Sequence, residues 1–382
     1  MERGRISAQQ LMIMMVLFVL GDTILVLPGS TAMLAGKDAW ISGLLTVAAG
    51  LGLIWFYAAF QKRFPAMTLV DVSVNLLGRW LGGAVSFFFL FGYLLLLAAS
   101  MLRVLGDFMT THVLPNTPVQ FIYLLFLVIS VKAVRSGLET IARTAEIVFP
   151  WVVMLITLLI MFVVPQSRLY HIEPVMAEGI KPILAGMYIF LAYAFMEPVA
   201  FYMVMPFVRL RQGKGLRKPL LLGSGMGGLI LVVIIFFCLT VFGPVITRES
   251  IYPSYLLAKK IELGEFLQRI EVIMAITWLF TLFFKLIISF YGTCLGAAQL
   301  FKLKDYRLLT LPLAMILMVL PDLLAPSVIG ISEIGQVYPL FDWTFSVGLP
   351  LCLLLVQLVR QKMKRSRSSE EQGALPQKGE PR

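Results

Sequence analysis

Three charged residues lie in stretches of the sequence that are otherwise apolar. Asp22 and Glu197 are acidic, and Lys285 is basic. An ionised side chain near the centre of a bilayer costs about 2.5–3.5 kcal/mol on insertion scales, so each of the three needs an oppositely charged partner or water. Because charged groups in such positions typically line a ligand or ion pathway, we treat these three as candidate ligand-binding residues.

The first apolar stretch is interrupted close to its middle. Gly21, Asp22 and Thr23 stand there, and Pro28 follows one to two turns later. Glycine and proline both weaken the backbone hydrogen bonding of a helix, so we expect an unwound segment. The free backbone groups of such a segment, together with the Asp22 and Thr23 side chains, are suited to hold a small polar ligand.

The sixth apolar stretch carries a similar interruption. Glu197 is followed by Pro198 at a comparable depth, and Tyr193 precedes the pair by one turn. Breaks at corresponding places in the first and sixth of ten helices indicate two inverted five-helix repeats, covering residues 1–164 and 165–359. In this arrangement the ligand site lies near the bilayer midplane, where half-helix dipoles point at it.

A polar stripe runs along the eighth apolar stretch. Thr277, Thr281, Lys285, Ser289 and Thr293 recur at a strict spacing of four residues. Such a stripe either lines a wet cavity or holds neighbouring helices together. The lysine within it favours a position facing a cavity, and by analogy with transporters in which a buried lysine replaces a sodium ion, Lys285 is a candidate coupling cation.

Two further groups of charged residues are interpreted as structural. Arg103 and Asp107 are four residues apart and therefore neighbours on one face of the third predicted helix, where they are placed to form an ion pair. Glu139, Arg143 and Glu146 line one side of the start of the fifth predicted helix.

The composition requires a membrane-embedded fold to position these residues. Of the 382 residues, 59% are hydrophobic and 14% charged, and the mean hydropathy is +0.89, whereas soluble domains carry about a quarter charged residues. Apolar runs of membrane-spanning length recur throughout the chain. We predict an all-α integral membrane protein with ten transmembrane helices, at residues 8–35, 40–60, 81–111, 117–134, 143–164, 182–207, 219–243, 267–298, 308–323 and 338–359.

The distribution of Lys and Arg predicts the orientation. When the loops are assigned alternately to the two sides, most basic residues collect on one side, which is therefore the cytoplasmic side. Both termini lie on it. Residues 360–382 begin with a basic cluster and continue into a mixture of Ser, Glu, Gln, Gly and Pro, so we expect a basic, disordered cytoplasmic tail.

Several functional classes are excluded by the sequence patterns. The formal net charge of +11 comes from basic residues in short loops rather than on one face of a domain, so no nucleic-acid partner is expected. The three cysteines stand singly in apolar segments, and no metal motif, phosphate-binding loop or nucleophile motif occurs. We expect neither enzyme activity nor a metal or other cofactor, and the bilayer itself is one partner.

The order of several short motifs resembles the endospore germination permease family, the B subunit of spore germinant receptors, within the amino acid/polyamine/organocation transporter superfamily. The resemblance covers essentially the whole folded chain. Its motifs are Ile6-Ser7 with Gln10, the break from Gly21 to Pro28, Gly137-Leu138-Glu139-Thr140-Ile141-Ala142-Arg143, Tyr252-Pro253, and Phe266-Leu267-Gln268-Arg269-Ile270-Glu271 leading to Trp278. Gln268 departs from the pattern, because an acidic residue is expected before the arginine.

The resemblance implies a receptor subunit in the spore inner membrane that binds a nutrient, commonly an amino acid. Its partners would be an A-type membrane subunit and a C-type lipoprotein, and helices 1, 3, 6 and 8 would form the walls of the pocket. The residues predicted to bind the ligand are Gly21, Asp22, Thr23, Pro28, Tyr93, Tyr193, Glu197, Pro198, Thr281 and Lys285.

Two other functions remain open from the residues alone. One is a proton-coupled carrier of an amino acid or organic cation, in which Glu197 or Lys285 titrates during the cycle. The other is a water or ion conduit that uses the stripe on helix 8 as its lining.

Overall fold

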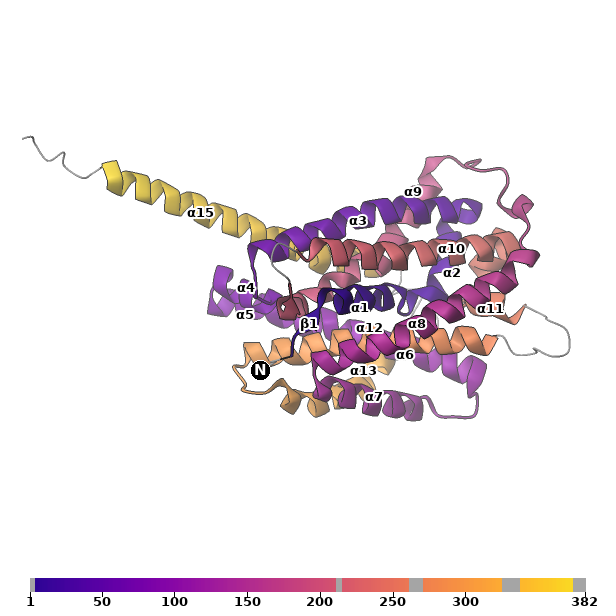
Figure 1. Cartoon of the computed structure of the whole chain (residues 1–382), viewed down its shortest axis with the longest axis horizontal. Coiled ribbons are helices and arrows are strands. Elements are labelled where there is room, and N and C mark those ends of the chain that lie inside the picture. The colour runs from indigo at the N-terminus through magenta and orange to yellow at the C-terminus, as the bar shows by residue number, and fades with distance from the viewer. Residues whose placement is uncertain (1–3, 211–214, 261–270, 325–336, 374–382) are drawn as a thin grey trace, which may run out of the picture.

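The computed structural model describes residues 4–210, 215–260, 271–324 and 337–373 and arranges them as a bundle of long helices (Figure 1). Within these residues, nine segments are long and apolar enough to cross a membrane. One of them, Thr23–Arg63, contains both α2 (Thr23–Ala35) and α3 (Ala39–Arg63), and the shorter apolar helix α1 (Ala8–Leu20) precedes it. Since α1 and α2 form one interrupted span, ten spans lie within the described residues, in agreement with the prediction. The predicted start of the eighth helix at 267–270 and the motif residues Phe266 to Ile270 lie outside the described part of the chain.

The first half of the chain continues with a short helix and three further spans. The bounds of its helices are α4 (Leu69–Leu77), α5 (Arg79–Phe89), η2 (Leu90–Leu94), α6 (Leu95–Phe108), η3 (Met109–Val113), α7 (Val119–Ser136) and α8 (Leu138–Val163). The third span runs continuously from α5 through η3. The short helix α4 was not predicted, and Thr68 and Asp71 form a capping box at its start.

The second half contributes the other five spans. The bounds are η4 (Val164–Gln166), η5 (Leu169–Ile172), α9 (Ile180–Leu191), α10 (Arg217–Glu249), α11 (Pro253–Lys259), α12 (Glu271–Leu300), η9 (Tyr306–Leu309), α13 (Thr310–Leu324), η10 (Thr344–Gly348) and α15 (Leu349–Gly373). The last span, Val337–Met363, includes η10 and the first part of α15.

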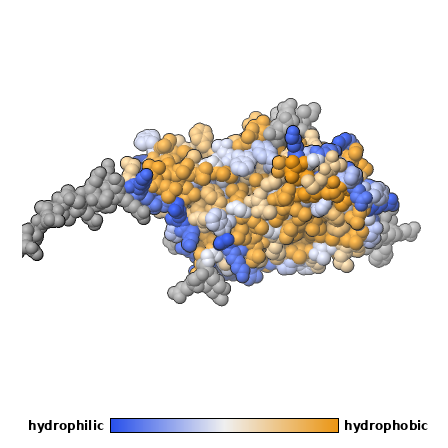
Figure 2. All heavy atoms as spheres, turned by 90° about the horizontal axis from the view of Figure 1, so that it is seen from above, coloured by the Kyte–Doolittle hydropathy of each residue, from blue (hydrophilic) through white to orange (hydrophobic). Residues whose placement is uncertain are grey.

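The outer surface of the bundle is apolar. Figure 2 shows hydrophobic side chains covering the visible side, with hydrophilic residues gathered towards the two ends of the long axis. Trp80, Leu125 and Met315 are exposed by 91%, 67% and 70%. Large apolar side chains exposed in this number are unfavourable in water but match the hydrocarbon core of a bilayer. The protein is therefore an integral membrane protein.

Both predicted helix breaks are confirmed. The first span stops at Leu20 and restarts at Thr23, so only Gly21 and Asp22 separate α1 from α2. The sixth span changes from α9 to a π-helical turn, η6 (Ala192–Met196), and then to the 3₁₀ segments η7 (Glu197–Met203) and η8 (Met205–Phe207).

A short parallel strand pair ties the beginning of the chain to the end of the sixth span. In it, β1 (Ile6–Ser7) pairs with β2 (Val208–Arg209). The Arg5 guanidinium also donates a hydrogen bond to the Pro206 carbonyl at 2.9 Å. Ser7 then caps α1 in a capping box with Gln10. The sequence did not predict this pairing, because two isolated dipeptides carry no strand periodicity.

The predicted disordered tail at residues 360–382 stays a prediction, although its first part is helical in the structure. The helix α15 continues to Gly373, because residues 360–372 contain neither glycine nor proline and several are good helix formers. Residues 374–382 lie outside the described part of the chain. The division into repeats at 1–164 and 165–359 stays a prediction. Figure 1 places the N-terminus and the far end of α15 at the same end of the bundle.

Candidate functional site

The two helix breaks meet at the side chain of Lys285 on α12. Its Nζ donates a hydrogen bond to Asp22 Oδ1 at 2.5 Å and forms a second ion pair with Glu197 Oε2. Lys285 is 0% exposed, Glu197 1% and Asp22 8%. Among the described residues, Lys285 is the only buried lysine or arginine. Three residues chosen separately from the sequence thus form one buried cluster, which we call the ion triad.

Gly21 allows this close approach of α12 to the first break. Its φ of +20° lies in a region that L side chains rarely adopt. A Cβ at this position would collide with the Lys285 side chain and would lie 2.9 Å from the Phe18 carbonyl oxygen. The absence of a side chain at residue 21 therefore makes room for the ammonium group beside Asp22.

Thr281 fastens the same break to α12. Its hydroxyl donates to the Gly21 carbonyl at 2.9 Å and also contacts the Trp278 carbonyl of its own helix. The other hydroxyls of the polar stripe on α12 belong to Thr277, Ser289 and Thr293. They donate to backbone carbonyls one turn earlier in the same helix. Among these four hydroxyls, that of Thr281 bonds a neighbouring span and the other three bond α12 itself, so both alternatives for the stripe stay predictions.

The helix is not unwound at Pro28, which lies inside α2. Proline cannot donate to the carbonyl four residues earlier, which belongs to Ile24. The Ser254 hydroxyl of α11 donates to that carbonyl at 2.7 Å and so replaces the missing backbone donor. Thr23 spans the break, since its hydroxyl bonds the Val19 and Leu20 carbonyls. Pro28 itself lies beyond the ion triad along α2.

Two tyrosines cover the Glu197 side of the ion triad. The Tyr338 hydroxyl donates to Glu197 Oε1 at 2.5 Å, and the Tyr338 ring stacks on Tyr193 with centroids 5.0 Å apart. Tyr193 lies in the π-helical turn η6, and Pro198 occupies the first turn of η7 directly after Glu197. π-Helical turns are frequent at functional sites because they redirect side chains out of the regular helical spacing.

Tyr93 belongs to a second buried polar cluster. Its hydroxyl donates to Asp342 Oδ1, which also accepts a hydrogen bond from Ser346 at 3.0 Å. Tyr93 lies in the π-helical turn η2 and Ser346 in the π-helical turn η10. Sequence reasoning missed Asp342 and Tyr338, although an acidic residue within the apolar run 338–359 is the same signal that singled out Asp22.

Arg103 and Asp107 lie on α6 and form an ion pair at 3.1 Å. Arg103 also pairs with Asp322 of α13 at 3.1 Å, and Tyr123 of α7 donates to the same carboxylate at 3.4 Å. Asp322 was not predicted. This network joins three helices and does not include any residue of the ion triad.

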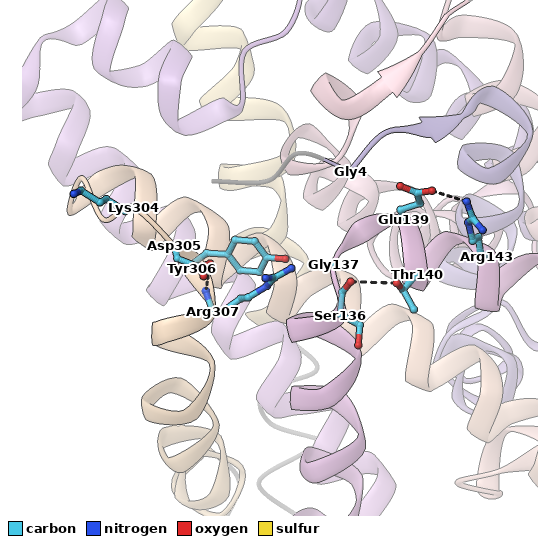
Figure 3. A pocket seen from close by; sticks show the side chains of 10 residues that line it. All are labelled: Gly4, Ser136, Gly137, Glu139, Thr140, Arg143, Lys304, Asp305, Tyr306 and Arg307. Atoms are coloured by element: carbon cyan, nitrogen blue, oxygen red, sulfur yellow. Dashed lines mark hydrogen bonds and ion pairs between the residues drawn. The ribbon is translucent and has the colours of Figure 1, made fainter.

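Glu139, Arg143 and Glu146 lie at the end of the bundle near the N-terminus. Arg143 pairs with Glu139 at 2.6 Å, and Gln10 donates to Glu146 at 2.9 Å. A pocket of about 700 Å³ lies at this end. Figure 3 shows Glu139, Arg143, Tyr306 and Arg307 among the residues that line it. These three predicted residues are therefore remote in their contacts from the ion triad. Among the described residues, no group of three or more His, Cys, Asp or Glu is placed to hold a metal ion.

Comparison with known families decides where the chain belongs. A family model described as spore germination protein matches residues 5–324. The chain belongs to this spore germination protein family. It is 30% identical to spore germination protein KB of Bacillus subtilis (strain 168), over 97% of this chain and 99% of that protein. It is also 28% identical to spore germination protein YndE of the same organism, over 94% and 98% of the two chains.

Two solved structures show that this family member has a transporter-like fold. One is Mhp1, a nucleobase-cation-symport-1 family transporter, in a closed conformation with bromovinylhydantoin bound (TM-score 0.61, 12% identity, 92% of this chain and 75% of Mhp1). The other is a Na⁺-coupled sialic acid symporter in a substrate-bound outward-open state (TM-score 0.59, 12% identity, 90% and 79% of the two chains). At this identity the likeness concerns the fold alone.

Proposed function

We propose that the chain is the nutrient-sensing B-type subunit of a spore germinant receptor and that it binds an amino acid at the ion triad. The observation that carries this proposal is the meeting of two broken helices at one buried lysine. Broken helices leave backbone groups free, and the α2 N-terminus carries a partial positive charge next to Asp22. A zwitterionic ligand presents one carboxylate and one ammonium, which are the charge types already paired there.

Binding of an amino acid would exchange internal ion pairs for ligand contacts. The ligand ammonium would replace Lys285 beside Asp22 and Glu197, and the ligand carboxylate would contact the displaced Lys285 ammonium and the first backbone amides of α2. A ligand shifts a conformational equilibrium only by its differential affinity for the two states. In this scheme the difference in affinity arises because the ligand frees Lys285. In the structure the Lys285 ammonium contacts both Asp22 at the break in the first span and Glu197 at the break in the sixth span.

The location and partners of the subunit are part of the same proposal. It would lie in the spore inner membrane with both termini on the spore core side, and it would pass the signal to an A-type membrane subunit and a C-type lipoprotein. The excess of Lys and Arg in the loops of one side supports this orientation, as does the position of β1 and the far end of α15 at one end of the bundle (Figure 1).

A proton-coupled amino acid or organic cation transporter is the second candidate. A lysine held between two carboxylates favours it, because exchange of protons or ligands among such groups is a common coupling device in carriers. The water or ion conduit receives less support, because the hydroxyls that would line it, in the polar stripe on α12, already donate to backbone carbonyls.

The first test is amino acid binding to the purified full chain, measured with a panel of amino acids by thermal shift, together with uptake by the same chain in liposomes. Binding without uptake is the result expected of a sensor. Uptake coupled to a pH gradient would establish the carrier instead, and absence of binding to any amino acid would refute the assigned ligand class.

The second test uses spores that produce variants of the chain. Tyr193→Ala and Gly21→Val should abolish nutrient-triggered germination, because they remove a ring that covers the ion triad and fill the space beside Lys285. The level of each variant in the spores is measured alongside, so that loss of the site is distinguished from loss of the folded protein. Tyr188→Ala is the matched control, since this half-buried tyrosine lies on the same span before the break. Normal germination with both site variants would contradict the assignment of the site.

A further inference from the structure

Asp342 is a fully buried carboxylate, and its hydrogen-bond donors among the described residues are uncharged. Its side chain is 0% exposed, and Tyr93 and Ser346 both donate to Oδ1. Oδ2 is buried and has no hydrogen-bond partner among the described residues. No ion pair joins Asp342 to a lysine or arginine in the described part of the chain. An ionised carboxylate in such surroundings is strongly unfavourable, and a buried group of this kind usually becomes neutral instead.

The balance of charge around Asp342 points the same way. Among the described residues, the charged groups nearest to Asp342 are Glu197 and Lys285, and the phenols around it are those of Tyr57, Tyr93, Tyr193 and Tyr338. Lys285 is already shared between Asp22 and Glu197. The ion triad therefore carries a formal charge of −1, and an ionised Asp342 would add a second negative charge with no further cation.

We propose that Asp342 binds a proton in this arrangement of the third and tenth spans and forms a proton site separate from the ion triad. The proton would sit on the carboxyl group, most simply on Oδ2, since both hydroxyl donors occupy Oδ1. No bond other than O–H forms, and the proton comes from water. Because Tyr93 belongs to the third span and Asp342 to the tenth, the neutral carboxyl joins these two spans through a hydrogen bond.

A proton bound in only one conformation makes the conformational equilibrium depend on pH. The arrangement in which Asp342 is buried holds one proton on this residue, whereas an arrangement in which Asp342 meets water releases it. By linkage, lower pH favours the arrangement with Asp342 buried, and higher pH disfavours it. The ratio of the buried to the hydrated arrangement changes by at most about tenfold per pH unit for a single proton. This dependence concerns the protein itself and does not require a germinant.

Infrared spectroscopy of the full chain in lipid nanodiscs tests the proposal directly. A neutral carboxyl has a carbonyl stretching band that an ionised carboxylate lacks, and isotope-labelled aspartate assigns the band to Asp rather than Glu. We expect an aspartic acid band at neutral pH that disappears in Asp342→Asn. Asp38→Asn is the matched control, because Asp38 is a buried carboxylate that accepts a backbone amide hydrogen bond, and its loss should leave the band in place.

A second variant keeps the test decisive if Asp342→Asn does not fold. Tyr93→Phe removes one donor to Oδ1 and should shift the band towards that of a less strongly hydrogen-bonded carboxyl. Absence of an aspartic acid band in the wild type, or its persistence in Asp342→Asn, would overturn the proposal. A band that appears only after Na⁺ and K⁺ are removed would also overturn it, because a metal cation would then be the occupant. None of these outcomes depends on amino acid binding.

Discussion

Lys285→Met is the substitution whose effect follows most directly from the ion triad. Methionine keeps much of the length of the side chain but removes the ammonium, so Asp22 and Glu197 lose their shared cation. Removing one partner of a buried ion pair typically costs 3–5 kcal/mol, because the other charge stays buried without compensation. We expect Lys285→Met to lower the free energy of unfolding by about 3–5 kcal/mol, which is roughly a hundredfold to a few thousandfold in the folding equilibrium.

A triple variant separates the cost of an unpaired charge from that of lost packing. Asp22→Asn, Glu197→Gln and Lys285→Met together remove all three charges while nearly conserving volume. Replacement of a whole buried ionic group by uncharged side chains is often neutral, so the triple variant should recover most of the loss and lie within about 1 kcal/mol of the wild type. If the proposed function is correct, the triple variant should nevertheless fail to bind an amino acid, because the proposed site recognises its ligand by these three charges.

The assay is equilibrium unfolding of the full chain in lipid-containing micelles, read out by denaturant midpoint at constant slope. Lys132→Met serves as the control for removal of a lysine, since Lys132 is exposed on α7 and should change the midpoint little. The reasoning would be refuted if Lys285→Met unfolded at the wild-type midpoint, or if the triple variant were no more stable than the single one.

Three further predictions use matched variants and the same unfolding assay. Gly21→Ala should lower the free energy of unfolding by about 1–3 kcal/mol more than Gly36→Ala, because both glycines have positive φ but of the two only Gly21 would place a Cβ against other atoms. Equal effects of the two substitutions would contradict the close approach of α12 to Gly21. Thr281→Val should lower the free energy of unfolding by about 1 kcal/mol more than Thr293→Val, because the Thr281 hydroxyl bonds the Gly21 carbonyl of another span whereas the Thr293 hydroxyl bonds a carbonyl of α12 itself. Equal denaturant midpoints would argue against a stabilising role for the Thr281–Gly21 hydrogen bond. Arg103→Met should lower the free energy of unfolding by about 2 kcal/mol, which is less than for a fully buried ion pair because its partner Asp322 is 36% exposed. It should leave amino acid binding intact, and a loss of binding would connect this network to the proposed site.

The spans and breaks could be predicted because each depends on local sequence. Apolar length locates a transmembrane helix, and Gly21 or Pro198 weakens the backbone wherever the rest of the fold lies. Pro28 illustrates the limit of local reasoning, because the hydroxyl of Ser254, more than two hundred residues away, supplies the donor that the proline removes. Tertiary contacts of this kind leave no periodic signal.

The pairing within the site could not be predicted for the same reason. Asp22, Glu197 and Lys285 each stood out from their apolar surroundings, but no spacing along the chain indicates that one lysine contacts both acids. Asp342 carried the same local signal and was overlooked, whereas Tyr338 carried none, since a tyrosine near a membrane helix end is ordinary. The π-helical turns that redirect Tyr93 and Tyr193 are likewise invisible in the sequence.

The strand pair between β1 and β2 has a mechanical consequence. It joins the residues just before α1 to the residues just after η8, and the hydrogen bond from Arg5 to the Pro206 carbonyl adds a second link. The strand pair therefore links the first and sixth spans at that end of the bundle. Any sliding of one span past the other would first have to break the β1–β2 hydrogen bonds. A relative rotation of the two spans that keeps the strand pair intact would have to occur at the breaks near Gly21 and Glu197, which lie beside Lys285.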